Sequence, residues 1–344
     1  GFLAVSYTDV VQGTLMFLAL ITVPVMALLS LDHPGDIFSY ATSNPYGPWE
    51  HGNPSYFNMV AGVSAATIIG NLAWGLGYFG QPHIVTRFMA LRSPAQAASA
   101  RRTGTIWVFI CYAGAVFTAL VSTVYFGQKS ESVTDQTGYE TIFLDLARIM
   151  FHPLIAGIVL TAVLAAIMST MSSQLLITSS ALIEDIYRIF KKDPNNTTLL
   201  VLSRAMVIGI ALIGMLLALN PSDTILGLVG FAWAGFGSAF GPVVVASLYW
   251  KRLTSQGAIA GMIVGAVTSF VWGSVDALSG MIYEIVPGVI LATLAMVIVS
   301  LATRPKEGVE EEFDTAADAT DYALAHPDED FSAALRNRGG STAV

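Results

Sequence analysis

Residues 71–83 read NLAWGLGYFGQPH, a mixture of glycines, aromatic residues and a proline inside an otherwise hydrophobic run. Trp74, Tyr78 and Pro82 recur every four residues, which places them on one face if the segment is helical. The glycines between them weaken the helix at a point where its backbone could open. Non-helical backbone at membrane depth is tolerated only where it lines a cavity or is packed in protein. The stretch therefore predicts either an interrupted helix that holds a ligand or an interfacial aromatic belt with a kink.

The composition indicates a membrane protein. Of the 344 residues, 54% are hydrophobic and 12% are charged, and the mean hydropathy is +0.64. An ordinary soluble domain carries roughly 25% charged residues. The single cysteine, Cys111, lies in an apolar run, so we expect neither a disulfide framework nor a cysteine metal site. No catalytic constellation stands out, and we expect a protein that is not an enzyme.

The negative charge is concentrated at the C-terminal end. Residues 305–344 hold ten acidic and three basic residues, whereas residues 1–304 are close to neutral. A segment of this kind is typical of a solvated tail, and we predict an acidic, disordered cytoplasmic tail over 305–344. Nothing in the charge pattern suggests binding to nucleic acid. Residues 1–304 form the predicted transmembrane domain.

Eight hydrophobic runs are long enough to cross a bilayer, which needs about 20 mostly apolar residues. These predicted spans cover residues 5–29, 57–80, 104–126, 153–180, 199–219, 224–249, 257–275 and 281–303. Between the third and fourth spans, the segment from Gly138 to His152 has apolar residues at helical spacing beside two charges. It predicts a short amphipathic helix on the outer face.

The basic residues orient these spans. Fourteen of the sixteen lysines and arginines lie on alternate connections, namely those after the second, fourth, sixth and eighth spans. The positive-inside rule assigns these connections to the cytoplasm. An even number of spans then places both ends of the chain on the cytoplasmic side of the plasma membrane.

The fourth span carries many hydroxyl side chains. Ala166, Ser169 and Thr170 stand at positions i, i+3 and i+4, so one face of a helix offers a carbonyl and two hydroxyl oxygens together. Such neutral oxygens suit a hard monovalent cation, with Na⁺ as the natural candidate. Hydroxyls in membrane helices also mediate close packing and bond to their own backbone, so both interpretations stay open.

Asp9 lies close to the start of the first span, in GFLAVSYTDVVQ. A carboxylate within a membrane segment is costly and marks a functional candidate. A polar setting at the end of the span is the alternative. Within the sixth span, residues 227–245 are rich in glycine, and their pattern favours tight helix packing, with a gating role as the second possibility.

Five separated blocks resemble the sodium/solute symporter family, and most closely its proline-transporting members. They are GFLAVSYTDVVQ, WGLGYFGQPHIVTRFMA, AAIMSTMSSQLLITSSALIEDIYR, GFAWAGFGSAFGPVV and GAIAGMIVGA. The resemblance runs through essentially all of residues 1–304. It implies an all-α polytopic membrane protein with an inverted-repeat fold of five plus five helices.

Family members of this kind have thirteen transmembrane helices, and the eight spans correspond to helices six to thirteen. The chain begins within a hydrophobic run, so we expect it to be incomplete at its N-terminus. The family's second helix, which supplies further sodium ligands and part of the substrate site, has no counterpart in this sequence.

The resemblance also assigns sites. Ser169 and Thr170 match the family's sodium-coordinating hydroxyl pair, with Ala166 in the place of the carbonyl ligand. Asp9 matches an acidic position implicated in the inner sodium pathway.

For the substrate, Trp74, Tyr78 and Pro82 match residues of the proline site on the broken helix. We add Gly75 to this predicted substrate site because it lies within the weakened segment.

The implied function is sodium-coupled symport of a small zwitterion, with L-proline as the expected substrate, by alternating access. Sodium is the coupling ion, and we expect no other cofactor. Sodium, the solute and membrane lipids are the expected partners. Two alternatives stay open: a sodium symporter for another amino acid or organic solute, and a membrane domain that senses a solute.

Overall fold

A computed structural model of the chain describes residues 2–43, 55, 57–91, 93–128, 136–191, 195–219 and 224–326. Every regular element within these ranges is helical. The chain divides into two compact units, the first formed by residues 1–61 and 104–224 and the second by residues 62–103 and 225–344. Each unit is described by itself.

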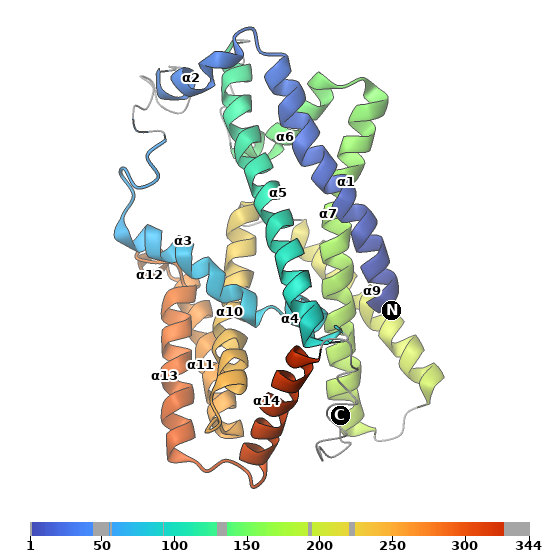
Figure 1. Ribbon diagram of the computed structural model, residues 1–344, viewed down its shortest axis with the longest axis vertical. Helices are drawn as coiled ribbons and strands as arrows, with labels where there is room; N and C mark the ends of the chain where they lie inside the picture. Colours follow the sequence, from blue (N-terminus) through green and yellow to red (C-terminus); the bar gives the residue numbers. More distant parts are fainter. Residues whose placement is uncertain are drawn as a thin grey trace. The chain divides into compact units, whose positions relative to one another are not determined.

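The first unit is organised around the packing of α1 on α7 (Figure 1). Its elements are α1 (Phe2–Leu29), η1 (Pro34–Asp36), α2 (Ile37–Ser43), the greater part of α5 (Pro94–Gln128), α6 (Gln136–Met150), α7 (Pro153–Ser180), the π-helical η3 (Ala181–Tyr187), α8 (Arg188–Phe190) and α9 (Asn196–Ala218). Fully buried Val23, Val121 and Leu146 join α1, α5 and α6 in one apolar core. Val159 and Ala162 of α7 belong to the same core, so α7 packs with these helices.

The second unit packs α11 against α13, with α10 lying on both (Figure 1). Its elements are α3 (Ala65–Gly77), η2 (Tyr78–Gly80), α4 (Pro82–Met89), α10 (Ile225–Tyr249), α11 (Ser255–Ser274), α12 (Asp276–Ser279), α13 (Ile285–Ala302) and α14 (Val309–Ala325). Glycines at 257, 261 and 265 lie on the face of α11 that meets α10 and α13, where a Cβ at any of them would crowd a neighbour. Small residues at this spacing let membrane helices approach closely.

Seven of the eight predicted spans are single helices, long and apolar enough to cross a membrane, within the described ranges. The predicted span over 57–80 begins too early, and it is interrupted, as the broken helix of the resemblance implies. Residues 57–64 are not helical, α3 ends after 13 residues at Gly77, and the chain passes through η2 before α4 begins at Pro82. The interruption falls within the glycine-rich stretch.

Polar residues of the connections cap the N-terminal ends of several helices. The side chain of Asn195 accepts a hydrogen bond from the Thr197 amide at the start of α9, and the Thr254 hydroxyl accepts one from the Gly257 amide at the start of α11. Ser64 caps α3 in the same way. Such caps satisfy amides that have no partner within the helix.

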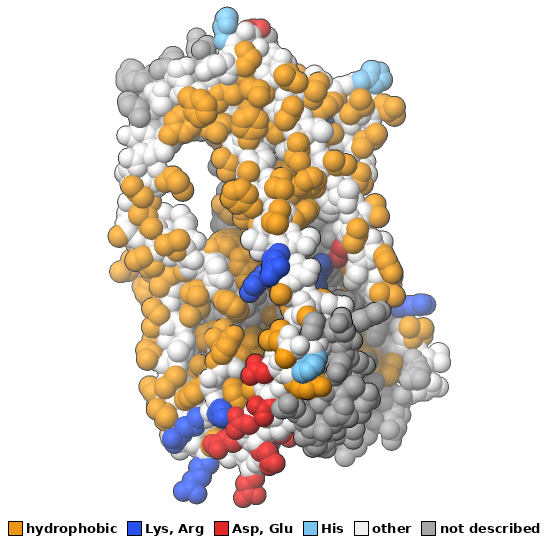
Figure 2. Space-filling model, in the orientation of Figure 1, with side chains coloured by type: hydrophobic (Ala, Val, Ile, Leu, Met, Phe, Trp, Pro, Cys, Tyr) orange, Lys and Arg blue, Asp and Glu red, His pale blue; other side chains and the backbone are white. Residues whose placement is uncertain are grey.

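The C-terminal segment differs from expectation. Part of the stretch predicted to be disordered forms α14, which carries three glutamates in its first turn. Figure 2 shows acidic side chains gathered over α14, whereas hydrophobic side chains cover much of the remaining visible surface. The predicted amphipathic helix before His152 is present as α6. Residues 327–344 of the predicted tail lie outside the described residues.

Large apolar side chains are exposed along the spans. Leu217 on α9 is 73% exposed and Phe270 on α11 is 63% exposed. A soluble protein rarely leaves so many large apolar side chains in contact with water. The surface therefore suits lipid or further membrane helices.

Candidate functional site

The first unit brings Asp9 and Ser169 together. The Ser169 hydroxyl, on α7, donates a hydrogen bond of 2.6 Å to Oδ1 of Asp9, on α1. Both side chains are half-buried. A charge-assisted O–H···O⁻ bond at this length is among the stronger hydrogen bonds in proteins. Two residues that are 160 positions apart, both predicted to serve a cation, are thus in direct contact.

Further oxygens lie on the same turn of α7. The Thr170 hydroxyl is 3.4 Å from the Ala166 carbonyl oxygen, a long contact that engages this carbonyl only weakly. The Ser173 hydroxyl donates to the Ser169 carbonyl at 3.0 Å. The Asp9 carboxylate and the Ser169 hydroxyl are in direct contact, whereas the Thr170 hydroxyl and the Ala166 carbonyl share a face of α7 by helical spacing.

This donor set fits a hard cation. Oxygen atoms are the preferred ligands of such ions, and the Asp9 carboxylate provides the negative charge that offsets the cost of removing the ion from water. Within the described ranges, no group of three or more histidine, cysteine or acidic side chains could hold a transition metal.

The second unit holds the interrupted helix. At the end of α3, a Cβ on Gly77 would overlap the indole of Trp233, and a Cβ on Gly80 would overlap the Phe236 carbonyl oxygen, both on α10. Glycine at these two positions lets the backbone of the interruption lie directly against α10. The glycines thus serve packing at the break as well as weakening the helix.

Trp74 takes part in an aromatic stack. Its ring centroid lies 5.5 Å from that of Trp233, with 14° between the ring planes, and 5.9 Å from that of Tyr283, with 15° between the planes. The Tyr283 hydroxyl donates to the Gly230 carbonyl at 2.6 Å. Tyr78 meets the edge of Trp233 at 4.8 Å and keeps 39% of its surface exposed. Tyr78 is thus the more accessible of the two predicted aromatic residues.

Because the helix is interrupted, Trp74, Tyr78 and Pro82 do not lie on one face of a single helix as expected. Gln81 has an extended backbone, with φ −86° and ψ 110°, and Pro82 occupies the first turn of α4. The four-residue spacing of Trp74, Tyr78 and Pro82 therefore does not continue along one helix, because the chain turns before Pro82. Gly75 is exposed, with no neighbouring atom near the position of a Cβ.

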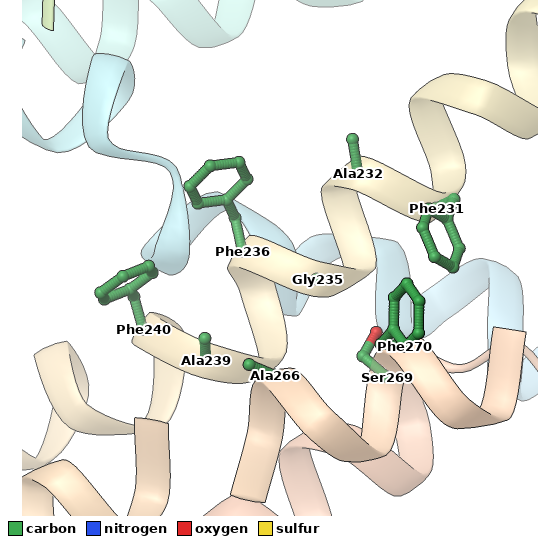
Figure 3. Close-up of a pocket in the computed structure, with 9 residues that line it drawn as sticks. All are labelled: Phe231, Ala232, Gly235, Phe236, Ala239, Phe240, Ala266, Ser269 and Phe270. Carbon is green, nitrogen blue, oxygen red and sulfur yellow. The ribbon is translucent and has the colours of Figure 1, made fainter. Parts of the chain in front are cut away.

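Two cavities lie in the second unit. One, of about 390 Å³, is an apolar groove on α10 and α11 between the Phe231–Phe270 and Phe236–Phe240 ring pairs (Figure 3). The other, of about 250 Å³, is more polar and lies at the start of α3, where Asn71, Tyr283 and Glu284 contribute to its wall. None of the four predicted substrate residues lines either cavity.

Sequence reasoning missed Trp233 and Tyr283. Trp233 stands in the glycine-rich sixth span, whose pattern favours packing, and Tyr283 lies at the start of the last predicted span, just before α13 begins. Only the fold places their rings on Trp74. The tryptophan within a run of glycines was the one available signal.

The chain is a multi-pass membrane protein. It has helices of membrane-spanning length, exposed apolar surfaces, and a helix that is interrupted where it packs against a partner helix. The family model described as "SSF: Sodium:solute symporter family" matches residues 1–265. The chain belongs to this family.

The chain is 45% identical over 320 residues to the "High-affinity proline transporter PutP" of Bacillus subtilis (strain 168), covering 92% of this chain and 65% of the relative. It is 43% identical over 317 residues to the "Sodium/proline symporter" of Escherichia coli (strain K12), covering 91% of this chain and 61% of the relative. The chain thus spans less than two thirds of the length of these relatives. They are transporters rather than enzymes.

Proposed function

We propose that the protein is a sodium-coupled symporter of a small zwitterionic solute, with L-proline as the substrate. The observation that carries this proposal is the hydrogen bond between Ser169 and Asp9, which assembles an anionic oxygen site on α1 and α7. The relatives named for proline transport support the choice of solute.

In this proposal, Asp9, Ser169, Ala166 and Thr170 bind Na⁺ in the first unit. Ion binding turns the Ser169 oxygen and the Asp9 carboxylate toward the cation, so their mutual hydrogen bond is exchanged for ion contacts. The interrupted segment in the second unit binds the solute through Tyr78, Trp74, Gly75 and Pro82. Tyr78 offers an accessible ring and hydroxyl, and opened backbone offers polar groups to a carboxylate.

The coupling follows from linkage. If Na⁺ binds more tightly to the conformation that also binds the solute, each ligand raises the affinity for the other by the same factor. Closure with both ligands bound then moves them together across the membrane. The protein works in the plasma membrane with both ends of this chain cytoplasmic, an orientation that cysteine labelling from either side of the membrane tests.

The decisive experiment uses the full-length protein in liposomes. Radiolabelled L-proline should accumulate when an inward Na⁺ gradient is imposed, and should not accumulate when K⁺ replaces Na⁺. Accumulation that is independent of Na⁺ would contradict the symport proposal. A panel of other amino acids and organic acids, measured in parallel, would reveal a different solute.

A matched pair of variants tests the ion site. Ser169→Ala should raise the Na⁺ concentration for half-maximal uptake about 10-fold, because it removes a hydroxyl ligand and a bond to a charged group. Ser179→Ala is the control, since the Ser179 hydroxyl bonds the Ser203 carbonyl on α9 at 3.0 Å and joins α7 to a different helix. An equal effect of both changes would reduce Ser169 to a packing residue.

A further inference from the structure

Trp233 touches the interrupted helix on both sides of the break. Its indole Nε1 donates a hydrogen bond of 2.9 Å to the Trp74 carbonyl, which precedes the break. Its own backbone carbonyl accepts a bond of 3.3 Å from Nε2 of Gln81, which follows the break. Gln81 is only 4% exposed. One residue of α10 therefore connects α3 to the start of α4.

The backbone of α10 reinforces this bridge. A Cβ on Gly237 would come within 2.7 Å of the Gly77 Cα, and the Gly80 backbone lies against Phe236 and Gly237. Such close approach leaves no room for water between the broken segment and α10. Polar backbone groups enclosed in this way need partners within the protein, since an unpaired group in a membrane interior is costly. The Trp233 indole supplies one such partner.

The ring of Trp233 also contacts both aromatic residues of the proposed substrate site. It is stacked on Trp74 and meets Tyr78 nearly at a right angle, with 84° between the rings. Parallel and edge contacts of this kind favour specific ring orientations in addition to burying area. The position of the Trp233 indole therefore constrains where the Tyr78 ring can lie.

We propose that Trp233 is a positioning residue for the substrate site: its indole N–H holds the Trp74 carbonyl, and its ring orients Tyr78 toward the accessible side of the break. This inference rests on the proposed function in that it treats the broken segment as the solute site. Trp233 itself need not touch the solute. Without the indole N–H, the α3 end of the break loses this hydrogen bond to α10, while the contacts of the Gly77 backbone with α10 are retained.

The test compares Trp233→Phe with Trp272→Phe in the full-length protein. Each change removes an indole N–H that donates to a backbone carbonyl, because Trp272 donates to the Ile282 carbonyl at 3.1 Å. Both residues lie in the second unit, but within the part of the chain that the structure describes the Trp272 ring does not contact the ring of Trp74 or of Tyr78. The pair therefore separates loss of an indole bond in general from loss of the bond at the break.

Two readouts are measured for each variant. Trp233→Phe should raise the KM for proline about 3- to 10-fold with less than about a 2-fold change in kcat, as expected when one hydrogen bond that orients a site is lost. It should also speed hydrogen–deuterium exchange of the amides of residues 78–81. Trp272→Phe should do neither. Equal effects of the two variants, or faster exchange with an unchanged KM, would overturn the positioning role.

Poor folding of Trp233→Phe would not end the test. Gln81→Met removes the second bond of the bridge from the opposite side and should give a smaller rise in KM in the same direction. An unchanged KM in this variant would overturn the bridge as a positioning device. If the wild type accumulates no proline, the proposed solute is wrong, and the kinetic comparison is made with the solute that the uptake panel identifies. The exchange comparison is independent of the solute.

Discussion

The two candidate sites are built in different ways. The oxygen site of the first unit lies on α1 and α7, two long helices whose regular spacing brings Ala166, Ser169 and Thr170 to one face. The aromatic site of the second unit lies where α3 stops and the backbone is held against α10. A small ion can be bound by side chains on intact helices, whereas the aromatic site depends on a helix that is interrupted. If the two proposed assignments hold, regular secondary structure suffices for the ion site, whereas the solute site requires a broken helix.

The largest effect is expected from Asp9→Asn, which removes the only charge among the four predicted ion ligands. We expect the Na⁺ requirement of uptake to rise about 100-fold, because the charge that offsets desolvation of the ion is lost. The KM for proline at saturating Na⁺ should change much less. Measuring uptake as a function of Na⁺ at several proline concentrations separates the two. An unchanged Na⁺ requirement would break the assignment of the first unit to the ion.

The next largest effect is expected from Gly80→Ala, which forces a methyl group into the α10 backbone at Phe236. We expect a loss of about 1–3 kcal/mol of stability, in line with overpacking of a filled interior. Thermal unfolding of the purified protein in detergent measures it. Gly235→Ala on α10 is the control, because nothing lies near the position of its Cβ, and the change should be neutral or slightly stabilising in a helix. Equal melting behaviour of the two variants would show that the break is not packed as described.

A moderate effect is expected from Tyr78→Phe, which keeps the edge contact with Trp233 and removes the hydroxyl. If that hydroxyl binds the solute, the KM for proline should rise about 3- to 10-fold with the Na⁺ requirement unchanged. Tyr249→Phe, at the exposed end of α10, is the matched control. If Tyr78→Phe changes the Na⁺ requirement instead, the assignment of the ion site to the first unit and the solute site to the second is contradicted.

The smallest effect is expected from Thr170→Ala. Thr170 is exposed, and its hydroxyl makes only a long contact with the Ala166 carbonyl. We expect the Na⁺ requirement to rise about 3-fold, as for loss of one neutral ligand. Thr161→Ala removes a hydroxyl that bonds the Gly157 carbonyl four residues earlier on the same helix and should leave uptake unchanged. Parallel Na⁺ titrations of both variants distinguish a ligand from an ordinary helix hydroxyl.

Much of the fold could be predicted because membrane-spanning helices can be recognised in a sequence by their length and apolar composition. Seven predicted spans are single helices among the described residues, and the amphipathic α6 lies where the spacing of apolar residues placed it. The second span was predicted to start too early, because hydropathy alone does not show that residues 57–64 are non-helical, whereas a break near Gly77 was expected from the glycines. The inverted repeat and the orientation of the chain ends stay predictions.

The residues of the two predicted sites differ in whether a local sequence pattern could show that they lie together. Ser169 and Thr170 share a face by helical spacing, and such a face is readable from the sequence. The same spacing misled for Pro82, because the rule assumes a continuous helix and the chain turns at Gln81. Trp233 is 159 positions from Trp74, and no local period connects them.

Helical period showed only that the candidate ligands on α7 share a face, and the family resemblance assigned them to an ion. The sequence by itself determined the membrane class, most of the helices and the weak point at the glycines. These follow from hydrophobic length and helical period, which are local properties of the chain. Only the tertiary structure decided that Asp9 bonds Ser169 and that Trp233 bridges the interrupted helix. Contacts between residues more than 150 positions apart depend on how helices pack, and packing is a property of the whole fold rather than of any stretch within it.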